Sequence, residues 1–187
     1  RLKRNLEERY PGRSVYVIDS LCASMGQGLL THLMLNKRDE GLSTQEVVAW
    51  VEENKGRLCH WFTVYDLNHL KRGGRVSAAA AFFGTMLSIK PVMHVDDGGH
   101  LVPVSKARGR KSSLLALVDQ MEATAIDPAS QTVFISHGDC EGDALFVAGE
   151  ITRRFGTRDI RLNYVGPVIG NHSGPGTLAL FFLGTKR

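Results

Sequence analysis

The sequence is poor in cysteine and contains no long apolar run. Its three cysteines, Cys22, Cys59 and Cys140, are scattered, and no two of them form a CxxC pair. An odd and sparse set argues against a disulfide framework and favours a reducing compartment, so a cytoplasmic location is expected. No apolar run approaches the roughly 18 residues needed to span a bilayer, which argues against stable membrane insertion. The basic start at residues 1–4 is not followed by an apolar segment and is therefore not interpreted as a secretory signal.

The sequence also lacks a strong excess of charge, internal repeats and low-complexity segments. Its formal net charge of +4 is compatible with an anionic ligand or partner, but it is too small and too dispersed to indicate nucleic-acid binding. The hydrophobic content of 43% and the charged content of 22% are ordinary for a globular protein. A chain of 187 residues is long enough to bury a sizeable core in one domain or two small ones.

Hydrophobic periodicity predicts alternating helices and strands, and hence a mixed α/β fold. Ser43 and Glu46 have the spacing of a capping box, Asp66 is expected to cap a short helix, and residues 96–99 predict a hairpin turn. A domain boundary is expected near residue 57, dividing the chain into 1–56 and 57–187. The expected helices are 2–10, 23–37, 43–54, 66–72, 77–86, 112–125 and 141–155, and the expected strands are 15–18, 58–64, 87–95, 101–107, 132–135, 160–164 and 178–183.

Residues 166–176 hold a single histidine, His172, among four glycines and two prolines. This density of glycine and proline predicts a bent loop with His172 and Ser173 at its tip, and neither a helix nor a regular strand. An imidazole on such a loop can donate a hydrogen bond to a carboxylate. It can equally be a structural histidine bonded to a backbone carbonyl.

Two further segments gather basic residues. Arg75 follows a Gly-Gly pair and either offers a bidentate fork to a carboxylate or phosphate, or is a solvated arginine at a helix start. Lys106, Arg108 and Arg110 form either a solvated basic turn or a docking surface for an acidic or phosphate-carrying partner.

Polar residues at the ends of expected strands are also candidates. Ser20 and Ser24 follow the expected strand 15–18, where ligands often bind in α/β folds, although helix capping by Asp19 or Ser20 is the simpler interpretation. The histidines and aspartates of 94–100 are explained by the hairpin without a metal. His137-Gly138-Asp139 has no nucleophile elbow beside it, and Asp139 is expected to cap the following helix.

Several of these segments together resemble the DegV family of bacterial fatty-acid-binding proteins, which have the EDD fold. The resemblance covers essentially the whole chain, but only the C-terminal two-thirds of the family's length. It implies that 1–56 is a remnant of a Rossmann-like first domain and that 57–187 is a complete α/β second domain. The matching segments are 17–28, 70–77, 88–91, 106–111, 134–139 and 166–176.

The resemblance also implies a function. The protein would not be an enzyme itself: it would bind a long-chain fatty acid in an apolar tunnel between the two domains and present it to a fatty acid kinase. The carboxylate would lie near His172, the position resembling Arg75 contributes to activity with the kinase, and no cofactor or metal is implied. A phosphotransfer subunit like that of dihydroxyacetone kinases, and a fragment without ligand binding, remain as alternatives. Apolar residues that would line the tunnel, or else belong to the plain core, are Trp61, Phe62, Phe82, Phe83, Met86, Leu87 and Ile89.

Overall fold

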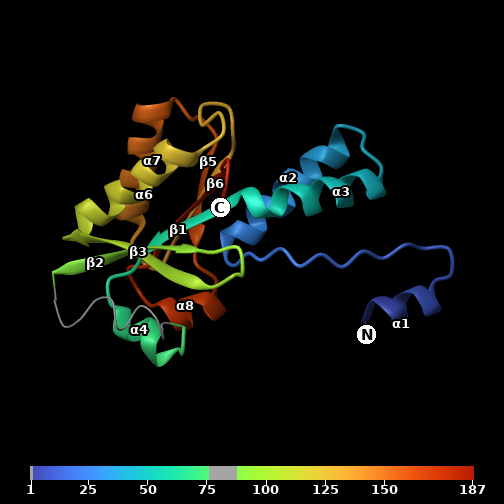
Figure 1. Cartoon of the computed structure of the whole chain (residues 1–187), viewed down its shortest axis with the longest axis horizontal. Helices are drawn as coiled ribbons and strands as arrows, with labels where there is room; N and C mark the ends of the chain where they lie inside the picture. Colours follow the sequence, from blue (N-terminus) through green and yellow to red (C-terminus); the bar gives the residue numbers. More distant parts are fainter. Residues whose placement is uncertain (1, 76–87) are drawn as a thin grey trace.

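The structure, a computed structural model, describes residues 2–75 and 88–187. Its elements form a six-stranded mixed sheet with helices on both faces (Figure 1). The helices are α1 (Leu2–Arg9), α2 (Met25–Asp39), α3 (Thr44–Asn54), the 3-10 turn η1 (Lys55–Arg57), α4 (Leu67–Arg72), α6 (Arg110–Thr124), α7 (Glu141–Phe155) and α8 (Pro167–Ser173). The strands are β1 (Leu58–Thr63), β2 (Ile89–Val95), β3 (Leu101–Arg108), β4 (Val133–His137), β5 (Ile160–Tyr164) and β6 (Leu178–Leu183).

The strands lie in the order β3-β2-β1-β6-β4-β5. β4 and β5 are parallel and are connected by α7, whereas the other neighbouring pairs are antiparallel. β2 and β3 form the predicted hairpin across residues 96–100. The mixed α/β prediction is therefore confirmed, and most elements agree with their predicted ranges. The predicted helix 77–86 lies outside the described residues.

The two faces of the sheet carry separate hydrophobic clusters. On β1, Cys59 and Trp61 belong to the cluster beneath α6 and α7. Leu58 and Phe62 alternate with them and join the cluster on the α2 side, as the period of two along a strand requires. Leu29 and Leu30 of α2 belong to this second cluster, so α2 packs directly on the sheet. The division at residue 57 remains a prediction.

Two predicted helix caps are confirmed. The Ser43 hydroxyl accepts a hydrogen bond from the Glu46 amide at 3.4 Å, and the Glu46 carboxylate accepts one from the Ser43 amide at 2.8 Å. At the start of α4, the Asp66 carboxylate accepts from the Asn68 amide at 2.8 Å. Both interactions satisfy amides that have no partner within their helix.

Two predictions about other element ends are wrong. Residues 15–18 do not join a described strand, and Val17 is 74% exposed. An apolar run becomes a strand only where another strand pairs with it. α7 begins after Cys140, not after Asp139, which has φ 54°. The segment 13–24 connects α2 to α1, which lies away from the remaining elements (Figure 1).

The glycine- and proline-rich segment is also corrected, because residues 167–173 form the helix α8. Pro167 occupies the first turn, where its missing N–H costs nothing and its fixed φ suits a helix. Gly170 lies inside the helix at a cost of about 1 kcal/mol relative to alanine, which packing against α4 can offset. The helix ends at Gly174, with φ 77°.

No helix in the described part of the chain is long and apolar enough to cross a membrane.

Candidate functional site

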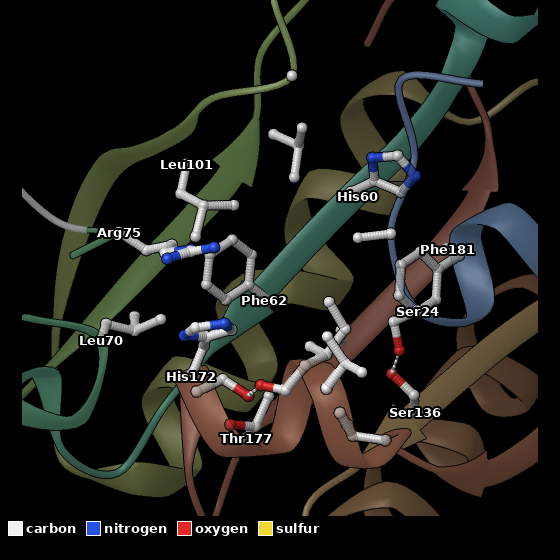
Figure 2. Close-up of a pocket in the computed structure, with 18 residues that line it drawn as sticks. Ser24, His60, Phe62, Leu70, Arg75, Leu101, Ser136, His172, Thr177 and Phe181 are labelled. Atoms are coloured by element: carbon white, nitrogen blue, oxygen red, sulfur yellow. Dashed lines mark hydrogen bonds between the residues drawn. The ribbon is translucent and has the colours of Figure 1, made fainter. Parts of the chain in front are cut away.

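A cavity of about 300 Å³ lies on the α2 side of the sheet, between β1, β6, α8 and the β2–β3 hairpin (Figure 2). On its floor, β1 and β6 pair so that His60 lies opposite Phe181 and Phe62 lies opposite Ala179. Most of the lining is apolar, and its main members are Phe62, Leu70, Leu101, Ile169, Ala179 and Phe181.

Arg75 and His172 lie together at one end of this cavity (Figure 2). They are brought together because α4, which precedes the Gly73-Gly74 turn, packs against α8. The Arg75 guanidinium donates from Nη1 to the Gly73 carbonyl at 2.7 Å. The Nδ1 atom of His172 is buried and has no hydrogen-bond partner among the described residues. His172 thus reaches the cavity from the last turn of a helix, not from the tip of a loop as predicted.

Four hydroxyl groups also line the cavity, and one of them, on Thr177, donates to the Gly174 carbonyl at 2.7 Å. Ser24 precedes α2 and its hydroxyl lies 3.1 Å from that of Ser136 on β4, with either atom able to donate. Ser173 donates its hydroxyl to the Ile169 carbonyl at 2.9 Å within α8. The Ser24–Ser136 pair joins segments that are 112 positions apart in the sequence, so it connects the start of α2 to the sheet.

Other predicted ligand residues do not line the cavity. The Ser20 hydroxyl accepts from the Cys22 amide at 3.3 Å and the Asp19 carboxylate accepts from the Leu21 amide at 3.0 Å, so both form local turns and neither caps α2. Ile89 packs against the apolar cluster without reaching the cavity. Trp61 faces α6 and α7 on the other side of the sheet and belongs to the core cluster there, in agreement with the plain-core alternative. Phe82, Phe83, Met86 and Leu87 lie outside the described residues.

His60 is a polar cavity residue that the sequence analysis missed, as is Ser136. The His60 side chain is 2% exposed, and neither ring nitrogen has a hydrogen-bond partner among the described residues. Burial, with smaller contributions from Arg187 and His94, lowers the pKa of His60 to about 3. The sequence did contain a signal for His60. Side chains two positions apart on a strand share a face, which places His60 beside Phe62, a predicted lining residue.

The predicted basic docking residues occupy two different environments. Lys106 and Arg108 are exposed on β3. Arg110 instead points into the fold: its Nε donates to Asp143 at 2.8 Å, and its guanidinium lies 4.3 Å from the ring centroid of Tyr65. With 16% of its side chain exposed, Arg110 offers little of its charge to a partner.

Together these contacts describe a site for an amphipathic ligand. The apolar walls exclude water from a hydrocarbon chain, and the Arg75–His172 end supplies donors for an anionic head. No group of three or more histidine, cysteine, aspartate or glutamate side chains in the described residues is arranged to hold a metal.

Comparisons with known proteins agree on one family. Residues 3–185 match a family model described as an uncharacterised protein of the DegV family. A DegV domain-containing protein from Clostridium perfringens is 47% identical over 185 residues, which are 99% of this chain and 64% of the relative. This chain therefore spans slightly less than two thirds of that relative.

Two solved structures illustrate the similarity of fold. The Streptococcus pneumoniae Fatty Acid Kinase (Fak) B3 protein, loaded with linoleic acid, has a TM-score of 0.85 at 25% identity and covers 97% of this chain and 64% of its own. DegV from Bacillus subtilis, described as a fatty acid binding protein, has a TM-score of 0.77 at 28% identity and covers 98% and 65%. The predicted DegV-like α/β fold is confirmed.

Proposed function

The chain belongs to the DegV family, and we propose that it binds a long-chain fatty acid in the cavity of Figure 2. The carboxylate would lie at Arg75 and His172, and the acyl chain would run along Phe62 and Phe181. The observation that carries this proposal is one apolar cavity with a guanidinium and an imidazole at the same end. The linoleic acid loaded into the pneumococcal neighbour supports the same ligand class.

The acyl chain would supply most of the affinity. Burying about 14 methylenes at about 0.8 kcal/mol each gives on the order of 11 kcal/mol before the costs of association. The cavity of about 300 Å³ lies at the lower end of the range for small-molecule sites, about 300–1,000 Å³.

The head group would be oriented by charge-assisted hydrogen bonds. A guanidinium carries five N–H donors, and one of those on Arg75 is bonded to Gly73. The imidazole of His172 lines the same end of the cavity and supplies a further hydrogen-bonding group beside it. Such bonds to a carboxylate are shorter and stronger than neutral ones, so they fix which end of the fatty acid lies at α8.

The role of the bound fatty acid would be presentation to a fatty acid kinase, which would phosphorylate the carboxylate with ATP. The name of the pneumococcal neighbour supports this partner, and the exposed Lys106 and Arg108 are the proposed docking residues. The chain would be a binding subunit without enzyme activity or cofactor of its own. Its three free thiols are compatible with the proposed cytoplasmic location.

Binding is tested by native mass spectrometry of the purified chain and by titration with oleate. Release of a long-chain fatty acid, and saturable oleate binding, are expected. His172→Ala and Arg75→Gln should each weaken oleate binding by about tenfold or more, the value of one hydrogen bond to a charged group, while circular dichroism stays unchanged. Arg72→Gln is the matched control, because Arg72 is exposed and contacts His69, outside the cavity. A chain that folds but takes up no fatty acid would contradict the proposal and favour a fragment without ligand binding.

Presentation is tested separately, with a fatty acid kinase, ATP and the oleate-loaded chain. Acyl phosphate should form only when kinase and chain are both present. Arg108→Glu should slow its formation without changing oleate affinity. ATP turnover by the chain alone would contradict the binding-subunit role and favour a phosphotransfer subunit.

A further inference from the structure

The cavity has a second polar end, remote from the proposed carboxylate site. Figure 2 shows His60 and the Ser24–Ser136 pair on one side of the cavity, Arg75 and His172 on the other, and Phe62 between them. His60 and Phe62 are two positions apart on β1 and point to the same face, about 7 Å apart by strand geometry. A ligand that fills the cavity from Arg75 past Phe62 therefore reaches His60.

The imidazole of His60 is buried without a hydrogen-bond partner in the part of the chain that the structure describes. It is 2% exposed, and both Nδ1 and Nε2 lack hydrogen bonds within the described residues. Most buried polar groups in folded proteins are hydrogen-bonded, and leaving one unpaired is costly. The ring is held in place by an edge contact with Phe181, at 5.4 Å between centroids, and by close approach to Gly26.

The protonation state of His60 limits what it can bind. Since burial lowers its pKa to about 3, the ring is neutral at neutral pH and offers one N–H donor and one acceptor nitrogen. An acidic head group gains little from such a ring compared with the guanidinium at the other end. A hydroxyl, which can either donate or accept, can bond to whichever ring nitrogen faces it.

We propose that His60 forms a second polar subsite, which accepts a hydroxyl group carried along the acyl chain of the ligand. Ser24 and Ser136 extend this subsite, because two hydroxyls bonded to each other at 3.1 Å leave one hydrogen and further lone pairs for a third oxygen. The ligand class is a hydroxylated long-chain fatty acid. This inference rests on the proposed function and adds a preference within it.

The test compares ricinoleate with oleate, since the two differ only by a hydroxyl in the middle of the chain. We expect the chain to bind ricinoleate about five- to tenfold more tightly than oleate, the effect of satisfying one buried polar group. In His60→Phe the ratio of the two affinities should fall to one or invert. In His60→Gln, which keeps a donor and an acceptor, the preference should partly return.

His94→Phe is the matched control. His94 lies on β2, and its Nδ1 has no hydrogen-bond partner among residues 2–75 and 88–187. Its ring stacks on Trp61 at 5.0 Å between centroids and does not line the cavity. The ricinoleate-to-oleate ratio should be unchanged in this variant. Equal binding of both fatty acids by the unmodified chain would overturn the subsite and indicate that water satisfies His60. Binding of neither would instead contradict the proposed function.

Discussion

Gly73 lies directly against the imidazole of His172. A Cβ atom built on Gly73 would lie 2.8 Å from Nδ1 of His172, closer than van der Waals contact permits. Gly73 ends α4 with an ordinary φ of −73°, so a side chain is excluded here by space and not by backbone conformation. The glycine pair before Arg75 therefore allows α4 and α8 to approach closely enough to join both head-group residues.

The first prediction concerns this contact. Gly73→Ala should displace His172 and weaken oleate binding about tenfold, as expected for losing one hydrogen bond to a charged group. Gly74→Ala is the matched comparison: nothing lies within 4 Å of a Cβ there, but φ is +71°. It should cost about 1–2 kcal/mol of stability and leave oleate affinity unchanged. Titration with oleate and urea unfolding measure the two effects, and equal affinity in Gly73→Ala and the unmodified chain would contradict the assigned role of His172.

Gly26 has the same relation to His60 at the other end of the cavity. A Cβ on Gly26 would lie 2.5 Å from Cδ2 of His60 and 2.9 Å from Cδ1 of Phe181. We predict that Gly26→Ala destabilises the chain by about 1–3 kcal/mol, the usual cost of overpacking. In a double-mutant cycle with His60→Ala the cost should become smaller, because the truncated side chain removes the contact with His60 and leaves only the one with Phe181. Gly28→Ala is the control and should not destabilise the chain, because its Cβ would make an ordinary 3.7 Å contact with Phe134. Strict additivity of the free-energy changes for Gly26→Ala and His60→Ala would disprove the close contact between the two residues.

The buried His60 also predicts a pH dependence of stability. The folded chain binds the His60 proton with a pKa of about 3 and the unfolded chain with the ordinary histidine pKa of 6.5, so the unfolded state holds more protons between these values. Stability therefore falls as the pH is lowered from 6.5 towards 3 and is fully present above 6.5. Burial also lowers the pKa of His94, which acts in the same direction.

The size of this effect is measurable. Each tenfold change in proton affinity is about 1.4 kcal/mol, so His60 contributes on the order of several kcal/mol across that pH range. Urea unfolding at a series of pH values should show a steep loss in the unmodified chain and a shallower one in His60→Phe. His100→Gln is the control, because the His100 side chain is 78% exposed. A pH profile that His60→Phe leaves unaltered would show that this histidine does not titrate on unfolding.

The sequence predicted most of the fold because its elements carry strong local signals. The capping box at Ser43 and the hairpin turn at residues 96–99 are encoded within a few positions, and both are confirmed. The prediction of a strand at residues 15–18 was wrong for the opposite reason. An apolar run does not reveal whether a partner strand is available. α8 was missed because packing against α4 outweighs the weak helix propensity of its glycine.

The site was only partly predictable for a similar reason. Local composition marked Arg75 and His172, and the resemblance to the DegV family implied that His172 lies near the carboxylate and that Arg75 contributes to activity with the kinase. Ser136 and His60 carry no local motif, and they line the cavity because β1, β4 and β6 lie side by side. In the sequence, Arg110 resembles its exposed neighbours Lys106 and Arg108. Its partner Asp143 comes from α7, 33 positions away, so no local pattern indicates the pairing.

The cluster around Arg110 makes a last prediction. Asp143 accepts from Arg110 at 2.8 Å and from the Tyr65 hydroxyl at 3.1 Å, while Nη1 of Arg110 is buried without a partner in the described residues. Removing the carboxylate charge would leave a largely buried guanidinium uncompensated. Asp143→Asn should therefore cost about 1–3 kcal/mol, measured by urea unfolding.

Two comparisons separate this effect from an ordinary surface pair. Arg153→Ala breaks an ion pair to Glu150 in which the Arg153 side chain is 66% exposed, and it should change stability by less than about 1 kcal/mol. Burial, followed by the hydrogen bond to Asp143, raises the pKa of Tyr65, so Asp143→Asn should also lower the Tyr65 pKa in an absorbance titration that uses Tyr65→Phe as reference. A loss of stability no larger than that of Arg153→Ala would mean that Arg110 is hydrated and free to reorient, which would return it to the proposed docking surface with Arg108.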